Sequence, residues 1–136
     1  MDNRTGGVRM RLDGDARLIA GVSGAVESFA RRAEMNDTAG ADLAEAAAKA
    51  CRDTLPLLTA EHPTLDVQID AFGDRIEVAL EHGGEALPSA GLDTFLESGD
   101  DEQVAGLELM ARVDRVLYNT ANGISRTTLV KYLKRT

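Results

Sequence analysis

The spacing of hydrophobic residues near the N-terminus changes from a period of two to a period of three or four, which predicts a strand followed by a helix. Residues 8–12 alternate between apolar and polar side chains and predict a short strand. An Asp-Gly-Asp break follows and ends at Asp15, a residue that can cap a helix. Apolar residues at helical spacing then predict the first helix over 16–33.

A second helix is predicted over 41–58, after a connector at 36–40. Pro56 has no backbone N–H to donate and its ring crowds the preceding turn, so it should kink or end this helix near Thr54.

Period-two alternation returns in the middle of the chain and predicts a β-hairpin. Its strands cover 65–70 and 76–81, joined by the turn Phe72-Gly73-Asp74. A short helix at 92–96 and a third helix at 101–113 are predicted to follow.

A second hairpin is predicted at the end of the chain, with strands at 115–120 and 125–133. They are joined by Asn122-Gly123, a strong hairpin signal. The 136 residues suffice for one domain, 1–136, with one core. The order strand, two helices, hairpin, helix, hairpin predicts an α+β two-layer sandwich, with a mostly antiparallel sheet and helices on one face.

The formal net charge of −8 is concentrated in one segment. Eight acidic residues and no Lys or Arg lie between Glu81 and Glu108, and the rest of the chain holds 15 acids and 15 bases. This charge disfavours a protein that tracks nucleic-acid phosphates. The segment is either a solvated loop or a surface that attracts a basic partner.

Several further classes are disfavoured by composition. No apolar run approaches the ~18 residues of a membrane span, and no apolar stretch follows the first basic residues as in a secretory signal. Cys51 is the single cysteine, which excludes an internal disulfide and a multi-thiolate zinc site. His62 and His82 form no metal motif, so we expect no metal site. Together, these features are typical of a reduced, cytoplasmic protein, which is what we expect.

Three motifs fall on these elements. They are Glu45-Ala-Ala-Ala-Lys49-Ala50 in the second helix, Glu81-His82-Gly83-Gly84-Glu85 after the first hairpin, and Val104-Ala105-Gly106-Leu107 in the third helix. Together with the order of elements, they resemble a bacterial anti-sigma factor of the serine-kinase type. That family lies within the histidine-kinase-like (GHKL, or Bergerat) ATPases. The resemblance covers nearly the whole chain and implies the two-layer sandwich of that fold.

The resemblance implies a catalytic role for Glu45 and a nucleotide site that includes Lys49. In the family a Glu polarises the attacking group, and an Asn four residues later holds Mg²⁺. Lys49 takes the place of that Asn, and a charged Lys has no lone pair for a metal. A simpler interpretation is an i, i+4 ion pair between Glu45 and Lys49, which we favour.

The other two motifs are also altered relative to the family. Glu81 stands where the resemblance implies an Asp that accepts a hydrogen bond from adenine, and Gly83 is retained. Glu85 and Val104 replace two phosphate-loop glycines, whereas Gly106 remains. Gly83 and Gly84 can equally be turn residues that follow a strand.

Two functions are weighed on these grounds. The first is a regulator that keeps the anti-sigma scaffold and acts by protein–protein binding, with a degenerate nucleotide site and no cofactor. The second is an active anti-sigma factor serine/threonine kinase that uses MgATP. We favour the first. The expected partner is a protein such as a sigma factor or an anti-sigma factor antagonist, with no nucleic acid and no membrane, and a homodimer is left open.

Overall fold

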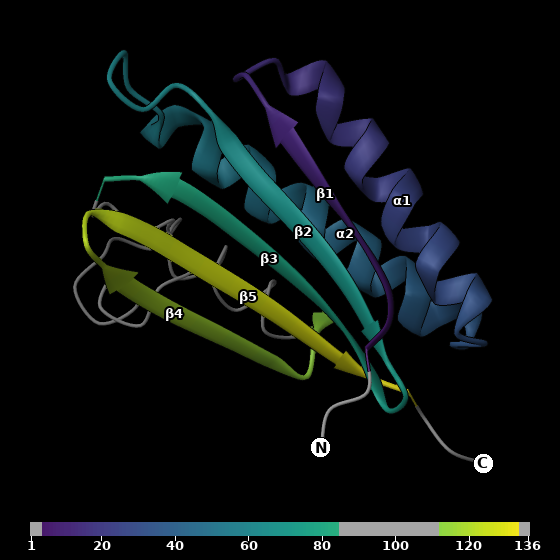
Figure 1. The fold of residues 1–136 in the computed structure, drawn as a ribbon. Coiled ribbons are helices and arrows are strands. Elements are labelled where there is room, and N and C mark those ends of the chain that lie inside the picture. Colours follow the sequence, from purple (N-terminus) through teal and green to yellow (C-terminus); the bar gives the residue numbers. More distant parts are fainter. Residues whose placement is uncertain (1–3, 85–111, 134–136) are drawn as a thin grey trace, which may run out of the picture.

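A computed structural model describes residues 4–84 and 112–133, and within these ranges the chain forms one antiparallel sheet backed by two helices (Figure 1). The strands are β1 (Arg4–Leu12), β2 (Leu65–Phe72), β3 (Arg75–Gly83), β4 (Arg115–Ala121) and β5 (Ile124–Tyr132). Their order across the sheet is β1-β2-β3-β5-β4, with every neighbouring pair antiparallel. The predicted α+β two-layer sandwich is thereby confirmed.

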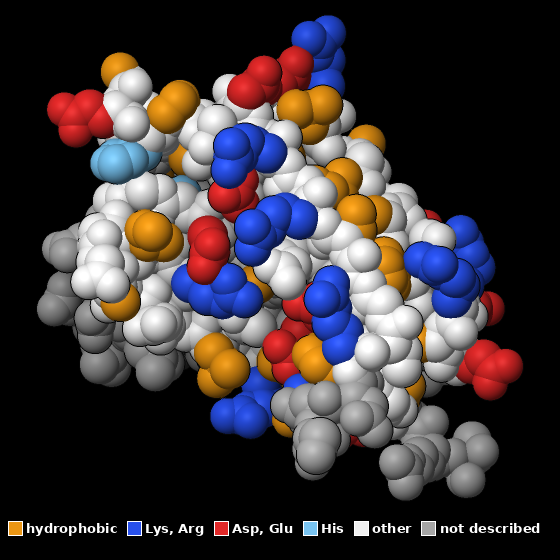
Figure 2. Space-filling model, viewed as in Figure 1, with side chains coloured by type: hydrophobic (Ala, Val, Ile, Leu, Met, Phe, Trp, Pro, Cys, Tyr) orange, Lys and Arg blue, Asp and Glu red, His pale blue; other side chains and the backbone are white. Residues whose placement is uncertain are grey.

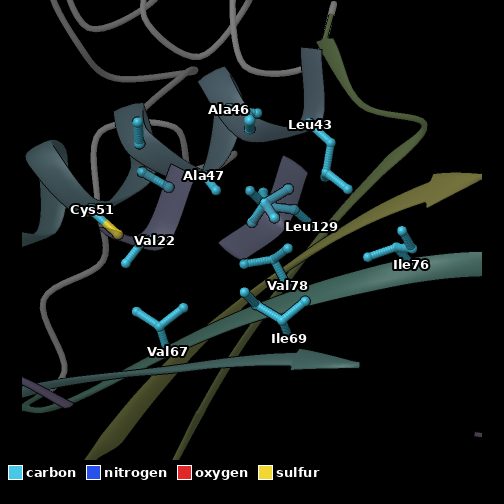
Figure 3. Close-up of a cluster of buried hydrophobic side chains, with 14 of the residues drawn as sticks. Val22, Leu43, Ala46, Ala47, Cys51, Val67, Ile69, Ile76, Val78 and Leu129 are labelled. Carbon is cyan, nitrogen blue, oxygen red and sulfur yellow. The ribbon is translucent and has the colours of Figure 1, made fainter. Parts of the chain in front are cut away.

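The helices are α1 (Ile19–Arg32) and α2 (Asp37–Thr54), each extended by a 3₁₀ turn, at Ala16–Leu18 and Leu55–Leu57 respectively. Both helices lie on the same face of the sheet (Figure 1). Side chains of alternate strand positions point toward them and meet the apolar face of each helix in one core. Figure 3 shows part of this core, in which Leu43 and Ala47 of α2 lie opposite Val78 and Leu129 of the sheet.

The start of α2 differs from the prediction. Residues 36–40 were expected as a connector, but the helix begins at Asp37, four residues before the predicted start. Asn36 caps it, because its Oδ1 accepts a hydrogen bond from the backbone N–H of Ala39 at 2.8 Å. Gly40 lies within this helix, and the two helices approach closely there: a methyl group on Gly40 would lie 3.1 Å from Cβ of Ala30.

The end of α2 agrees with the prediction. The helix ends at Thr54 and Pro56 lies in the 3₁₀ turn that follows. Both predicted hairpins also form, and β1 extends four residues further toward the N-terminus than predicted because it pairs with β2 from Arg4 onward.

The other face of the sheet carries charged side chains in cross-strand pairs (Figure 2). The carboxylates of Asp66 and Glu81 face each other across β2 and β3, an arrangement that would be repulsive without counter-charges. Each is paired with an arginine: Arg11 lies 2.8 Å from Asp66, and Arg126 lies 2.6 Å from Glu81.

Several predictions lie outside the described residues. They concern the helix at 92–96, all but the last two residues of the helix at 101–113, and Glu85, Val104 and Gly106. Among the helices that the structure describes, none is both long and apolar enough to cross a membrane.

Candidate functional site

The polar side of α2 forms one wall of a cavity of about 510 Å³. Its lining includes one carboxylate and three cationic side chains. The lining residues are Ser23, Glu45, Ala48, Lys49, Arg52 and Arg112. Two of the residues predicted from the sequence, Glu45 and Lys49, are therefore brought together here. They lie one helical turn apart on α2, with Arg112 approaching from the segment before β4.

The ion pairs in this cavity differ from the predicted one. The Glu45 carboxylate contacts the guanidinium of Arg112, which also lies 3.7 Å from Asp42. Lys49 Nζ lies 3.6 Å from Asp53, one turn further along α2. The predicted Glu45–Lys49 pair does not form, because each residue has an alternative partner of opposite charge.

Arg112 is held in place by the sheet. The Lys131 ammonium group, nearly buried in β5, donates a hydrogen bond to the Arg112 carbonyl at 3.1 Å. Two residues later, the backbone N–H of Asp114 donates to the Val130 carbonyl at 2.9 Å. The backbone at Arg112 is thus anchored on β5, and the Arg112 side chain links this part of the sheet to Glu45 on α2.

Sequence reasoning did not identify Arg52 and Arg112 as site residues. Arg52 lies three positions after Lys49 on α2, a spacing that places both on one side of a helix. Arg112 carried no comparable signal, since it is far from α2 in the sequence and reaches it only through the tertiary fold. The candidate site consequently holds three cations, where the sequence analysis identified one.

Glu81 lies on the opposite face of the sheet from Glu45 and Lys49. Its carboxylate is paired with Arg126 on the neighbouring strand β5, and α2 packs on the other side of the sheet. The alternation in β3 explains this placement, because Ile76, Val78 and Leu80 are the buried side chains and Glu81 has the opposite parity.

The side chain that β3 turns toward the helices at this end is His82, which is only 4% exposed. Its Nδ1 lies 2.9 Å from the carbonyl oxygen of Gly83. A carbonyl oxygen only accepts, so Nδ1 is the donor in this bond. Nε2 has no hydrogen-bond partner among the residues that the structure describes.

Gly83 lies at the end of β3 beside a second cavity of about 520 Å³, on the side of the sheet that carries Glu81. The imidazole of His62 packs directly over Gly83, in space that any larger residue's Cβ would occupy. His62 itself is exposed in the connector before β2. Gly83 therefore permits a loop-to-strand contact in this structure.

Two other groups near the candidate site are held in their neutral forms. Burial raises the pKa of the Cys51 thiol to about 12, which fits a small core residue rather than a nucleophile. Burial, together with the nearby Asp53 carboxylate, raises the pKa of Tyr118 well above its usual range. Both groups are therefore un-ionised near neutral pH.

Within residues 4–84 and 112–133, no three His, Cys, Asp or Glu side chains are grouped so that they could hold a metal ion. Comparison with models of known protein families and with curated proteins finds no match for this chain. The fold and the site thus define an α+β sandwich with a cationic cavity beside its second helix.

Proposed function

We propose that this protein is a regulator of the anti-sigma type that keeps a histidine-kinase-like scaffold and acts by binding a protein partner, without using a nucleotide. The proposal is supported by the resemblance in the sequence and by the contacts that the residues of its motifs make in the structure. The order of elements is compatible with that scaffold, since a strand and two helices precede the hairpin and a second hairpin closes the sheet.

The observation that carries the proposal is the pairing of Lys49. At the position where the resemblance implies a Mg²⁺ ligand, the structure has an ammonium group 3.6 Å from Asp53. A charged Lys offers no lone pair, and a divalent cation placed beside it would be repelled. Glu45, the implied catalytic residue, is engaged by Arg112.

The sheet side of the site supports the same proposal. The resemblance implies a carboxylate that accepts a hydrogen bond from adenine, but Glu81 faces away from the helices. The inward position next to it belongs to His82, whose Nδ1 lies 2.9 Å from the carbonyl oxygen of Gly83. The expected acidic contact is therefore missing from the described part of the site.

One observation favours the alternative of an MgATP-dependent serine/threonine kinase. Arg52 and Arg112 join Lys49 around the cavity beside α2, and cations of this kind stabilise phosphate groups. We rank this function second because Arg112 is neutralised by Glu45 and Asp42, and Lys49 by Asp53.

Thermal unfolding separates the two functions. We expect no change in melting temperature with millimolar MgATP relative to MgCl₂ alone. A kinase with micromolar affinity would gain about 4 kcal/mol of stability at a 1,000-fold excess over its Kd, and so a rise of many degrees. The control variant is Arg126→Ala, on the face of the sheet opposite the helices. A rise in melting temperature that the wild type and Arg126→Ala show, and that Arg52→Ala lacks, would establish the alternative and overturn our proposal.

A further inference from the structure

The β4–β5 hairpin exposes large apolar side chains on the face of the sheet that is opposite the helices. Leu117 is 44% exposed, Ile124 47% and Tyr132 38%. All three lie at positions that alternate with the buried residues of the hairpin, so they point away from the helical layer. The other exposed large apolar residues of the described chain, Val8 and Leu18, lie outside this hairpin.

Smaller apolar groups connect these side chains along the hairpin. Ala121 lies opposite Ile124, and the methyl-bearing Thr128 lies opposite Leu117. Val130 continues the same side of β5 toward its end. Figure 2 shows hydrophobic side chains over β4 and β5, beside the charged pairs of the other strands. We call the outward positions of β4 and β5 the hairpin face.

The charges on the hairpin face are of one sign. Neither β4 nor β5 contains an Asp or Glu, and the charged residues at their outward positions are Arg115 and Arg126. The face is therefore cationic, although the whole chain has a formal net charge of −8.

Arg115 is the cation of the hairpin face that has no carboxylate partner among the residues that the structure describes. Arg126 is 2.6 Å from Glu81 of β3. The carboxylate next to Arg115 in the sequence, that of Asp114, accepts a hydrogen bond from the backbone N–H of Tyr132 at 2.7 Å. The exposed guanidinium of Arg115 can thus form a two-bond pair with a carboxylate from outside the chain.

We propose that the hairpin face is a docking surface for an acidic amphipathic helix of a protein partner. The apolar side of that helix would cover Leu117, Ile124 and Tyr132, and one of its carboxylates would pair with Arg115. The proposal does not depend on whether the protein binds nucleotide, because the cavity beside α2 lies on the helical side of the sheet.

A helix fits this surface better than an added strand. The backbone of β5 already pairs with β3 on one side and β4 on the other, so a partner on the face contacts side chains only. Helices packed on sheet faces are a standard layer arrangement, and amphipathic helices are a common recognition element. The eight residue steps from Ile124 to Tyr132 span about 27 Å, the length of a helix of about 18 residues.

The charge of the face selects an acidic partner. Two copies of this chain stacked face to face would each bring an unpaired Arg115 and no carboxylate from the hairpin, and a basic helix would meet the same repulsion. The acidic residues elsewhere in the chain are screened at 0.15 M salt, where the Debye length is about 8 Å. An acidic helix is therefore compatible with the protein's net charge.

Fluorescence anisotropy of a labelled peptide with the full chain tests the proposal at about 0.15 M salt. The peptide has about 18 residues, with Leu on one helical side and Glu on the other. We expect micromolar binding to the wild type. Leu117→Ser and Arg115→Glu should each weaken it by about 10-fold or more. The matched controls Leu18→Ser and Arg31→Glu change exposed residues outside the hairpin face and should bind as the wild type does.

Unchanged melting temperatures of the variants will show that each still folds, and Arg115→Lys, which keeps the charge, should bind more tightly than Arg115→Glu. The absence of peptide binding at millimolar concentration would overturn the proposal, as would equal losses in the two controls. Two results would assign the face to another occupant and so contradict us. One is self-association in sedimentation equilibrium that Leu117→Ser abolishes. The other is binding to phosphatidylglycerol vesicles that Leu117→Ser and Arg115→Glu abolish.

Discussion

Two glycines in the helices offer a matched test of how closely α1 and α2 pack. Gly24 lies in α1, and a methyl group added there would have no atom of another described element within 4 Å. Gly40 lies in α2, and the same methyl group would approach Cβ of Ala30 to 3.1 Å. Replacing a helical glycine with alanine gains up to about 1 kcal/mol of intrinsic helix stability, and this gain applies to both positions.

The two substitutions should therefore have opposite outcomes. Gly24→Ala should stabilise the protein by about 0.5–1 kcal/mol. At Gly40 the new contact is shorter than the optimal carbon separation of about 3.5–4.0 Å, so the helices must move apart. Overpacking of this kind costs about 1–3 kcal/mol, which cancels or exceeds the helical gain.

Thermal unfolding followed by circular dichroism measures the difference. For a domain of this size, 1 kcal/mol corresponds to a shift in Tm of about 4 °C. We expect Gly24→Ala to raise Tm by about 2–4 °C, and Gly40→Ala to melt at or below the wild type. Equal increases for both variants would refute the close approach of the two helices.

Three further predictions concern single residues. Asn36→Ala should lower the free energy of unfolding by about 1 kcal/mol in urea denaturation, because the cap of α2 is lost, while the neighbouring Asp37→Ala should have a smaller effect. The pKa of the Cys51 thiol is raised to about 12 in the folded protein. The thiol's contribution to the free energy of unfolding is therefore present below about pH 9 and is lost as the pH rises from about 9 to 12. Above pH 9, the stability of the wild type should fall more steeply than that of Cys51→Ala. Lys49→Asn alone should not create a thermal response to MgATP, because the orientation of Glu81 is unchanged; a response equal to that of the triple variant with Glu85→Gly and Val104→Gly would contradict this.

The strands and turns were predictable from the sequence because their signals are local. Alternating apolar residues marked β2 and β3, and Asn122-Gly123 marked the turn between β4 and β5, where both residues have positive φ. The start of α2 was missed because Gly40 resembles a connector residue. Its reason for being glycine is the contact with Ala30, which no local pattern reveals.

The candidate site was less predictable, for two physical reasons. Motif matching selected Glu81, although the alternation of Ile76, Val78 and Leu80 already assigned it to the outer face and His82 to the inner one. Arg112 was not predictable at all, since its contact with Glu45 depends on how the end of the chain packs against α2.

The central claim is that the protein does not use a nucleotide, and calorimetric titration of the full chain with ATP, with and without Mg²⁺, tests it most directly. We predict no measurable heat of binding in either titration, because Lys49 is paired with Asp53 at the position where the resemblance implies a metal ligand, and Glu81 faces away from the helices. Saturable binding with a micromolar Kd that requires Mg²⁺ would contradict the claim.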